Sequence, residues 1–178
     1  MNDSQSLELA IHEDVALVPH DSAWAEAFLL EQQRLLRFAP GQFVDIQHFG
    51  STAIPGIPAK PIIDILAGVA SMEVADALTT PLLQFGYTTS VEFNATLVGR
   101  RWFMRHAFGR RTHHLHVVVF GSAEWRRRLK FRDALRSSAE LAHEYAALKV
   151  RLAAMHTADR EAYTNAKAEF VLSVAGDA

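Results

Sequence analysis

Apolar and polar positions along the chain predict a helix, then a group of short strands, and then helices again. Residues 22–39 carry apolar side chains at near-helical spacing, so we expect a helix with one buried face. Alternating or β-branched runs predict strands over 44–50, 62–69, 87–93, 100–108 and 112–120. Helical patterns cover 72–86, with a break near Pro81, and then 123–135, 139–155 and 160–174.

This order puts the strands in the middle of the chain and helices at both ends. The expected fold class is α+β, with a small mixed β-sheet flanked by helices and further helices at the C-terminus. Residues 1–12 are polar and predict a loose segment. We therefore divide the chain into a flexible N-terminal leader, residues 1–18, and a single domain, residues 19–178.

The composition agrees with one globular domain and disfavours several classes of protein. Of the 178 residues, 49% are hydrophobic and 21% are charged, which is enough apolar surface for a core. The net charge is only −2, so we expect neither nucleic acid nor a membrane as partner. The chain has no cysteine, which excludes disulfides and thiolate catalysis, and it lacks a signal-peptide pattern. We therefore expect a cytoplasmic protein.

Asp64 stands alone in the apolar run IIDILAGV. On a strand, alternate side chains share a face, so Asp64 lies with Ile62 and Leu66. Burial of an unpaired carboxylate costs several kcal/mol, so Asp64 needs a partner or an opening to solvent. A functional role is one interpretation, and a purely structural hydrogen bond is the other.

Three histidines fall within four residues of the run THHLHVVVF. Alternation places His114 and His116 on one face of that strand, where two imidazoles can share a metal ion or an anion. With Asp64 on a neighbouring strand they would form a set of two histidines and one carboxylate. The alternative is one histidine satisfied in the core and the others facing water.

The loop between the strands 44–50 and 62–69 offers groups that bind phosphate. Gly50 and Ser51, with Thr52 after them, can present backbone N–H groups and hydroxyl groups to an anion. Lys60 precedes Asp64 by four residues and can meet a phosphate as a point charge. An ordinary turn and a solvated lysine would explain the same residues.

Two arginines of the strand 100–108 are further candidates for phosphate binding. Arg101 and Arg105 share one face of that strand, and their guanidinium groups have the forked donors that phosphate accepts. A solvated surface is the simpler interpretation.

Several segments together resemble the GrpB family, whose members have a nucleotidyltransferase-like fold. The resemblance is carried by HFGSTAIPGIPAKPIIDI and THHLHV, and it continues through FRDALR, YAALK and YTNAKAEF. It covers the chain from about Pro19 to Val174 and implies a minimal nucleotidyltransferase-like fold. In members of that superfamily, a Gly-Ser pair helps to hold the nucleotide triphosphate, and carboxylates bind two divalent ions.

Carried over to this chain, the resemblance implies roles for Gly50 and Ser51 in phosphate binding and for Asp64 as the first metal carboxylate. The position of the second carboxylate is Leu66, which cannot bind a metal. His114 and His116 stand where a third acid is expected. Such a site should hold Mg²⁺ poorly and tolerate Mn²⁺ or Zn²⁺ better.

Three functions therefore remain open. The first is an enzyme that uses a divalent ion (Mn²⁺, Mg²⁺ or Zn²⁺) to transfer a nucleoside monophosphate or phosphoryl group to an unknown acceptor. In it, Asp64, His114 and His116 are the catalytic and metal-binding residues. The second is a non-catalytic module that binds a nucleotide, another phosphate-containing small molecule or a protein partner, like the domain joined to dephospho-CoA kinases. The third is a metal-dependent hydrolase built on the same three residues.

Overall fold

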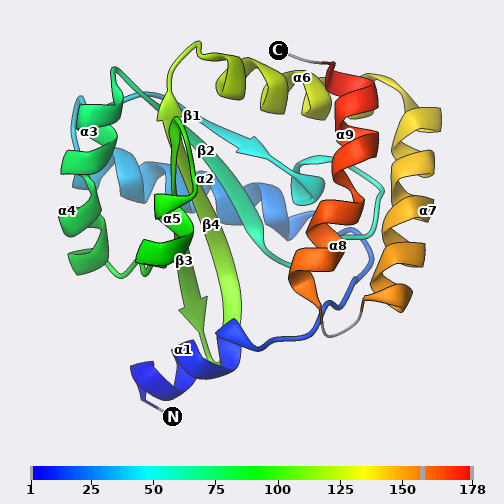
Figure 1. Cartoon of the computed structure of the whole chain (residues 1–178), viewed down its shortest axis with the longest axis horizontal. Coiled ribbons are helices and arrows are strands. Elements are labelled where there is room, and N and C mark those ends of the chain that lie inside the picture. The colour runs from blue at the N-terminus through cyan, green and yellow to red at the C-terminus, as the bar shows by residue number, and fades with distance from the viewer. Residues whose placement is uncertain (1, 157–158, 177–178) are drawn as a thin grey trace.

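The computed structural model describes residues 2–156 and 159–176 (Figure 1). The strands are β1 (Phe43–Phe49), β2 (Ile63–Val69), β3 (Arg100–Ala107) and β4 (Arg110–Val119). The helices are α1 (Asp3–Ile11), α2 (Ala23–Phe38), α3 (Met72–Ala77), α4 (Thr79–Gln84), α5 (Val91–Ala95), α6 (Ala123–Ser137), α7 (Ala139–Met155), α8 (Arg160–Ala166) and α9 (Ala168–Ala175), with a short 3-10 helix η1 (Ser51–Ala53). Met1 of the expected leader, and residues 157–158 and 177–178 of the expected domain, lie outside the described residues.

The four strands form one mixed sheet in the order β1-β2-β4-β3. β2 runs parallel to β4, and each outer strand is antiparallel to its neighbour. The register of the parallel pair sets Asp64 opposite His114 and Leu66 opposite His116. Because paired residues point to the same side of a sheet, these side chains share one face, as the alternation predicts. The expected α+β class with a small mixed sheet is confirmed.

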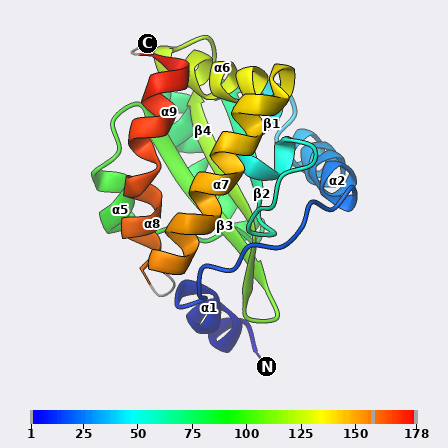
Figure 2. The same cartoon turned by 90° about the vertical axis from the view of Figure 1, so that its right-hand side faces the viewer.

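The sheet has two unlike faces. Ile63, Ile65 and Ala67 belong to the main core, which α2, α3 and α4 cover. On the other face, Leu66 and Val118 pack beneath α6. Figure 1 shows α6 across the top of the sheet, and Figure 2 shows α8 and α9 end to end, with α7 beside them, in front of it. The face that carries Asp64 is therefore bordered by the C-terminal helices.

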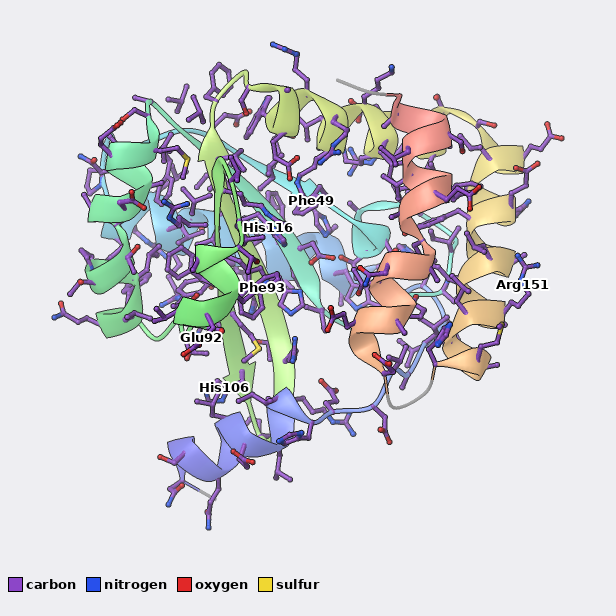
Figure 3. The ribbon with its side chains drawn as sticks, in the orientation of Figure 1. Phe49, Glu92, Phe93, His106, His116 and Arg151 are labelled. Atoms are coloured by element: carbon purple, nitrogen blue, oxygen red, sulfur yellow. The ribbon has the colours of Figure 1, made fainter. Side chains whose placement is uncertain are left out.

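Residues 3–11 differ from the loose segment expected for the N-terminus, because they form the helix α1. Asn2 caps this helix: its side chain accepts a hydrogen bond from the backbone N–H of Gln5, and the Gln5 side chain accepts one from Asn2 N. The helix lies against the β3–β4 hairpin, where the backbone N–H of Gly109 donates to Ser6 Oγ and Ser6 Oγ contacts His106 Nδ1 at 3.0 Å (Figure 3). The polar composition of residues 1–12 does not predict this helix, because the hairpin that it packs against lies about 100 residues away in the sequence.

The strand expected over 87–93 is wrong. Only Thr88 pairs with the sheet, in a single bridge to Met104. Ser90 then caps the short helix α5 by accepting a hydrogen bond from Phe93 N. Because the Ser90 side chain hydrogen-bonds a backbone N–H, it favours the start of a helix over continued strand pairing, and the extended segment ends after two residues.

Two expected helices are divided in the structure. The run 72–86 breaks at Leu78, and Pro81 lies in the first turn of α4, where its missing N–H costs nothing. The run 160–174 breaks at Lys167, between α8 and α9. No helix within the described residues combines the length and the apolar composition that crossing a bilayer requires.

Candidate functional site

The chain turns sharply at Gly50, directly against Asp64. Gly50 has φ of 71°, a backbone conformation that side chains disfavour, and a Cβ atom there would lie 2.4 Å from Asp64 Oδ2. Phe49, the residue before it, pairs with Asp64 across β1 and β2. The bend that begins η1 therefore places its backbone on the Asp64 carboxylate, and a glycine is required there for both reasons.

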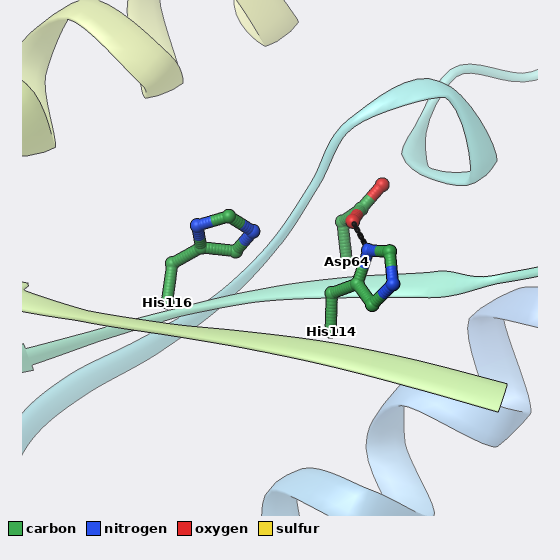
Figure 4. A group of neighbouring side chains, drawn as sticks. All are labelled: Asp64, His114 and His116. Atoms are coloured by element: carbon green, nitrogen blue, oxygen red, sulfur yellow. Dashed lines mark ion pairs between the residues drawn. The ribbon is translucent and has the colours of Figure 1, made fainter. Parts of the chain in front are cut away.

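Asp64 and His114 face each other across β2 and β4, with Asp64 Oδ1 3.3 Å from His114 Nδ1 (Figure 4). Their side chains are 27% and 15% exposed, so the pair is sheltered but open to water. Burial alone raises the pKa of Asp64, but the hydrogen bond and charge of His114, with the charges of Lys60 and Lys167, lower it overall. Burial lowers the pKa of His114 despite the opposing effect of Asp64. At neutral pH we therefore expect a charged Asp64 that accepts a hydrogen bond from a neutral His114.

This arrangement leaves the second nitrogen of His114 without a partner. If Nδ1 carries the proton toward Asp64, Nε2 is an acceptor, and it is buried with no hydrogen-bond partner among the described residues. Trp102 lies beside it, with ring centroids 5.5 Å apart. A buried polar atom of this kind points to a ligand or to a proton that is moved.

His116 lies further along β4, next to Phe49 and 8% exposed (Figures 3 and 4). Its Nδ1 is 3.0 Å from a guanidinium nitrogen of Arg100. A guanidinium can only donate, so Nδ1 accepts and Nε2 carries the proton. Burial and the charges of Arg128 and Arg100 hold the pKa of His116 well below its ordinary value, so the ring stays neutral.

Asp64, His114 and His116 are brought together as the sequence predicts, and each offers a donor atom within 4.8 Å of the others. That spacing and the donor types suit one zinc or manganese ion after small side-chain rotations. The hydrogen bond of His116 opposes metal binding. A metal-binding histidine normally donates the N–H of its other ring nitrogen to an acceptor, but here Nδ1 of His116 faces the guanidinium group of Arg100, which is a donor. Leu66 is fully buried at the position of a second carboxylate, so the donors do not fit a two-metal site.

The two hydroxyl groups of the loop have different surroundings. Tyr145 hydrogen-bonds Ser51, which places the Ser51 hydroxyl between the loop and α7. Thr52 is buried and points away from Asp64: its hydroxyl lies 3.0 Å from His48 Nε2 and donates to the carbonyl of Ile62. The side chain of Thr52, expected to bind phosphate, is thus used within the fold.

Three lysines surround Asp64, and only one of them was expected. Lys60 lies at the end of the loop, with Nζ 4.9 Å from the centroid of the Tyr163 ring. Lys149 of α7 and Lys167 at the end of α8 also act on this region through their charges. Nothing in the local pattern of either helix marks its lysine as part of a site on a distant strand, although both follow a tyrosine by four residues.

The two arginines expected to bind phosphate lie on the other face of the sheet. Arg101 pairs with Asp76 at 2.6 Å, and Arg105 pairs with the buried Glu31 at 2.6 Å. The register of β3 against β4 instead places Arg100 opposite Val118, on the face of His116. The structure therefore does not bring Arg101 and Arg105 to Asp64.

Comparison with known proteins decides the family. The family model described as GrpB protein matches residues 14–176, almost the whole chain. The chain belongs to the GrpB family. The chain is similar to the glutamate-rich protein GrpB of Alkalihalophilus pseudofirmus: the two are 36% identical over 89% of the chain and 92% of the relative. The match to a solved structure, the conserved protein GrpB from Enterococcus faecalis, has a TM-score of 0.80 at 34% identity and covers 90% of the chain and 94% of that structure.

Other relatives of this GrpB-family chain are longer or match it in part. The YqkA protein of Bacillus subtilis is 39% identical over 88% of the chain, and the chain spans 45% of the length of that relative. A protein named dephospho-CoA kinase from Mycobacterium bovis is 40% identical over 74 residues, which is 40% of the chain and 18% of that protein.

Proposed function

We propose that this GrpB-family protein binds a phosphate-containing small molecule beside Asp64 and transfers a nucleoside monophosphate or phosphoryl group from it to an acceptor. The observation that carries the proposal is the placement of Asp64. It lies at the mouth of β2 against the bend at Gly50, contacts His114, and is bordered by lysines. A sheltered carboxylate with cations around it suits a reaction in which negative charge moves between oxygen atoms.

The residues around Asp64 have separate roles in this proposal. Asp64 orients His114, and the unpartnered Nε2 of His114 is the candidate to accept a proton from the acceptor group. The Nε2–H of His116 is a donor toward the same region. The backbone at Gly50 and the hydroxyl of Ser51 border the phosphate. Since Nε2 of His114 is covered, the substrate must displace side chains to reach it.

A divalent ion belongs to the proposal as a single ion. Asp64 would hold it, with His116 as a further ligand if the contact with Arg100 opens, so that Nε2 of His114 stays free to act as the base. When bound, such an ion would polarise a phosphoryl oxygen. Leu66 in place of a second carboxylate argues against two-metal chemistry, so the proposal requires the protein's own cations to neutralise the rest of the phosphate charge.

The deciding experiment combines ligand binding with product release. A thermal-shift series with nucleoside triphosphates, each with Mn²⁺, Mg²⁺ or Zn²⁺, should raise the melting temperature of the parent protein. Asp64→Asn, which keeps the shape of the side chain, should abolish the metal-dependent part of that rise. Release of pyrophosphate, left by transfer of the nucleoside monophosphate, or of nucleoside diphosphate, left by transfer of the phosphoryl group, by the parent and not by the variant would support transfer. Full turnover by Asp64→Asn would refute the proposal.

A second candidate function is favoured by the partial match to the proteins named dephospho-CoA kinase. The chain would then be a non-catalytic module that binds a nucleotide or a protein partner. On that proposal, nucleotides stabilise the parent protein in the same thermal-shift series, and neither pyrophosphate nor phosphate is released under any metal condition. Bound transition metal that His116→Ala removes, with hydrolysis of phosphate esters, would instead indicate a hydrolase.

A further inference from the structure

Two C-terminal helices carry the same pair of residues at the same spacing. Tyr145 and Lys149 lie one turn apart on α7, and Tyr163 and Lys167 lie one turn apart at the end of α8. Residues four apart share one side of a helix, so each pair presents a ring and an ammonium group together. Both pairs border Asp64, and the proposed function assigns no individual role to either of them.

The contacts of these lysines bring them to one place. Lys149 is 1% exposed; its Nζ donates to the carbonyl of Pro58 and lies 5.0 Å from the Tyr145 centroid. Lys167 and Lys60 lie 4.3 and 4.9 Å from the centroid of Tyr163, so one ring holds two ammonium groups. The loop and two helices thus contribute one lysine each.

Neighbouring acids do not match the charges of the two helix lysines. Among the described residues, no carboxylate forms an ion pair with Lys149 or Lys167, and Asp64 is the acid whose charge acts on both. Burial, followed by the charges of Lys167 and Lys60, lowers the pKa of Lys149 to about 7, and burial lowers that of Lys167 to about 8. Like charges held together in a sheltered place destabilise the fold unless an anion joins them.

We propose that Lys60, Lys149 and Lys167 together bind the polyphosphate chain of the ligand, and that they do so without a metal ion. A diphosphate or triphosphate carries enough negative charge, spread over enough length, to contact three ammonium groups at once. Ammonium groups bind phosphate as point charges from several directions, as three separate elements provide here. The bend at Gly50 and Ser51 borders the same carboxylate and completes the surroundings. This inference rests on the proposed function for the class of ligand.

Acidic side chains near Lys60 could compete with the anion for this lysine. Lys60 also lines a second hollow of about 210 Å³ together with Glu13, Asp14 and Arg110, so it is shared between two environments. Lys149 and Lys167 do not line that hollow. The sharper test is therefore made at Lys167.

The test uses inorganic tripolyphosphate as probe, by titration calorimetry near pH 6.5 with EDTA present. The parent protein should bind it, and Lys167→Met should weaken binding at least tenfold. Lys167→Arg keeps the charge and should stay within about threefold of the parent. Lys130→Met removes an exposed lysine of α6 and is the matched control, with affinity unchanged. If Lys167→Met fails to fold, Lys60→Met replaces it.

One variant separates this inference from the proposed function. Asp64→Asn removes the negative charge beside the lysines, so it should tighten metal-free tripolyphosphate binding severalfold while it abolishes metal-dependent turnover. If the parent protein binds tripolyphosphate but shows no turnover, the lysine site stands and the transfer proposal is refuted. If it shows turnover but no metal-free binding, the transfer proposal stands and the lysine site is refuted. The inference would be overturned if the parent protein showed no binding up to about 10 mM tripolyphosphate. Equal losses of affinity in Lys167→Met and Lys130→Met would overturn it as well.

Discussion

Gly50 and Asp64 show how a single backbone position controls the site. The glycine both adopts a positive φ and lies against the carboxylate, so its hydrogen cannot be replaced without moving Asp64. Gly56, in the same loop, also has a positive φ, of 81°, but nothing lies within 4 Å of a Cβ there. The two glycines therefore separate the cost of backbone conformation from the cost of contact with Asp64.

Substitution of these two glycines by alanine should give unequal losses of stability. Gly56→Ala should lower the free energy of unfolding by about 1 kcal/mol, the cost of a positive φ for a residue with a Cβ. Gly50→Ala should cost at least about 1–3 kcal/mol more, since its Cβ must displace the Asp64 carboxylate. Urea unfolding of both variants measures the difference. Equal losses would show that Gly50 serves only the turn.

At the scale of elements, the N-terminal helix depends on the hairpin that it covers. Ser6 is 6% exposed, accepts a hydrogen bond from Gly109 N and contacts His106 Nδ1. Ser6→Ala removes both contacts and should lower the free energy of unfolding by about 1–2 kcal/mol. Ser4→Ala, on the exposed side of the same helix, should change it by less than about 0.5 kcal/mol. Hydrogen exchange at Gly109 should accelerate only in the first variant, and unchanged exchange there would contradict the docking of α1.

What the sequence could predict at this scale depends on how local the cause is. The partnership of Asp64 with His114 follows from two strands that alternate, so it is recoverable once both are taken as neighbours. The face of Arg101 and Arg105 depends on the register of β3 against β4, which no local pattern contains. Arg100 was missed for the same reason. Lys149 and Lys167 come from helices whose contact with the loop is set by tertiary packing, so of the lysine cluster only Lys60 could be predicted.

The elements that were wrongly predicted have similar causes. α1 is polar because it covers the end of a hairpin instead of a core, and its apolar period is too weak to mark a helix. Residues 87–93 have strand-like composition, but Ser90 offers a helix cap that local hydrogen bonding favours. The structure of α1 is therefore decided by a tertiary contact, and that of residues 87–93 by a helix cap, and composition alone predicts neither.

For the whole molecule, buried histidines and lysines should make stability depend on pH in two separate windows. Burial lowers the pKa of His48 and of His113 from 6.5 to about 4. Between these values the unfolded chain binds protons that the folded chain does not, so stability falls as the pH falls from about 6.5 to about 4. Glu31 and Asp64, whose pKa values are lowered overall although burial raises them, lose their contribution at still lower pH.

The second window comes from Lys149 and Lys167. Burial, then the charges of Lys167 and Lys60, lowers the pKa of Lys149 from 10.5 to about 7, so between these values the folded chain releases a proton that the unfolded chain keeps. The cost of a buried ammonium group is therefore fully present below about pH 7 and is relieved as the pH rises toward 10. Unfolding free energy of the parent should increase by at least about 1 kcal/mol from pH 7 to pH 10, before other groups titrate.

Lys149→Met isolates this effect, because methionine fills a similar volume without a charge to bury. The variant should lose most of the rise between pH 7 and pH 10, and Lys167, with a pKa of about 8, accounts for the part that remains. Lys130→Met should keep the slope of the parent. Urea unfolding at intervals of one pH unit measures all three proteins. A variant at Lys149 with the parent's slope would mean that this ammonium group is solvated in the folded protein, and its charge would then cost less than its burial indicates.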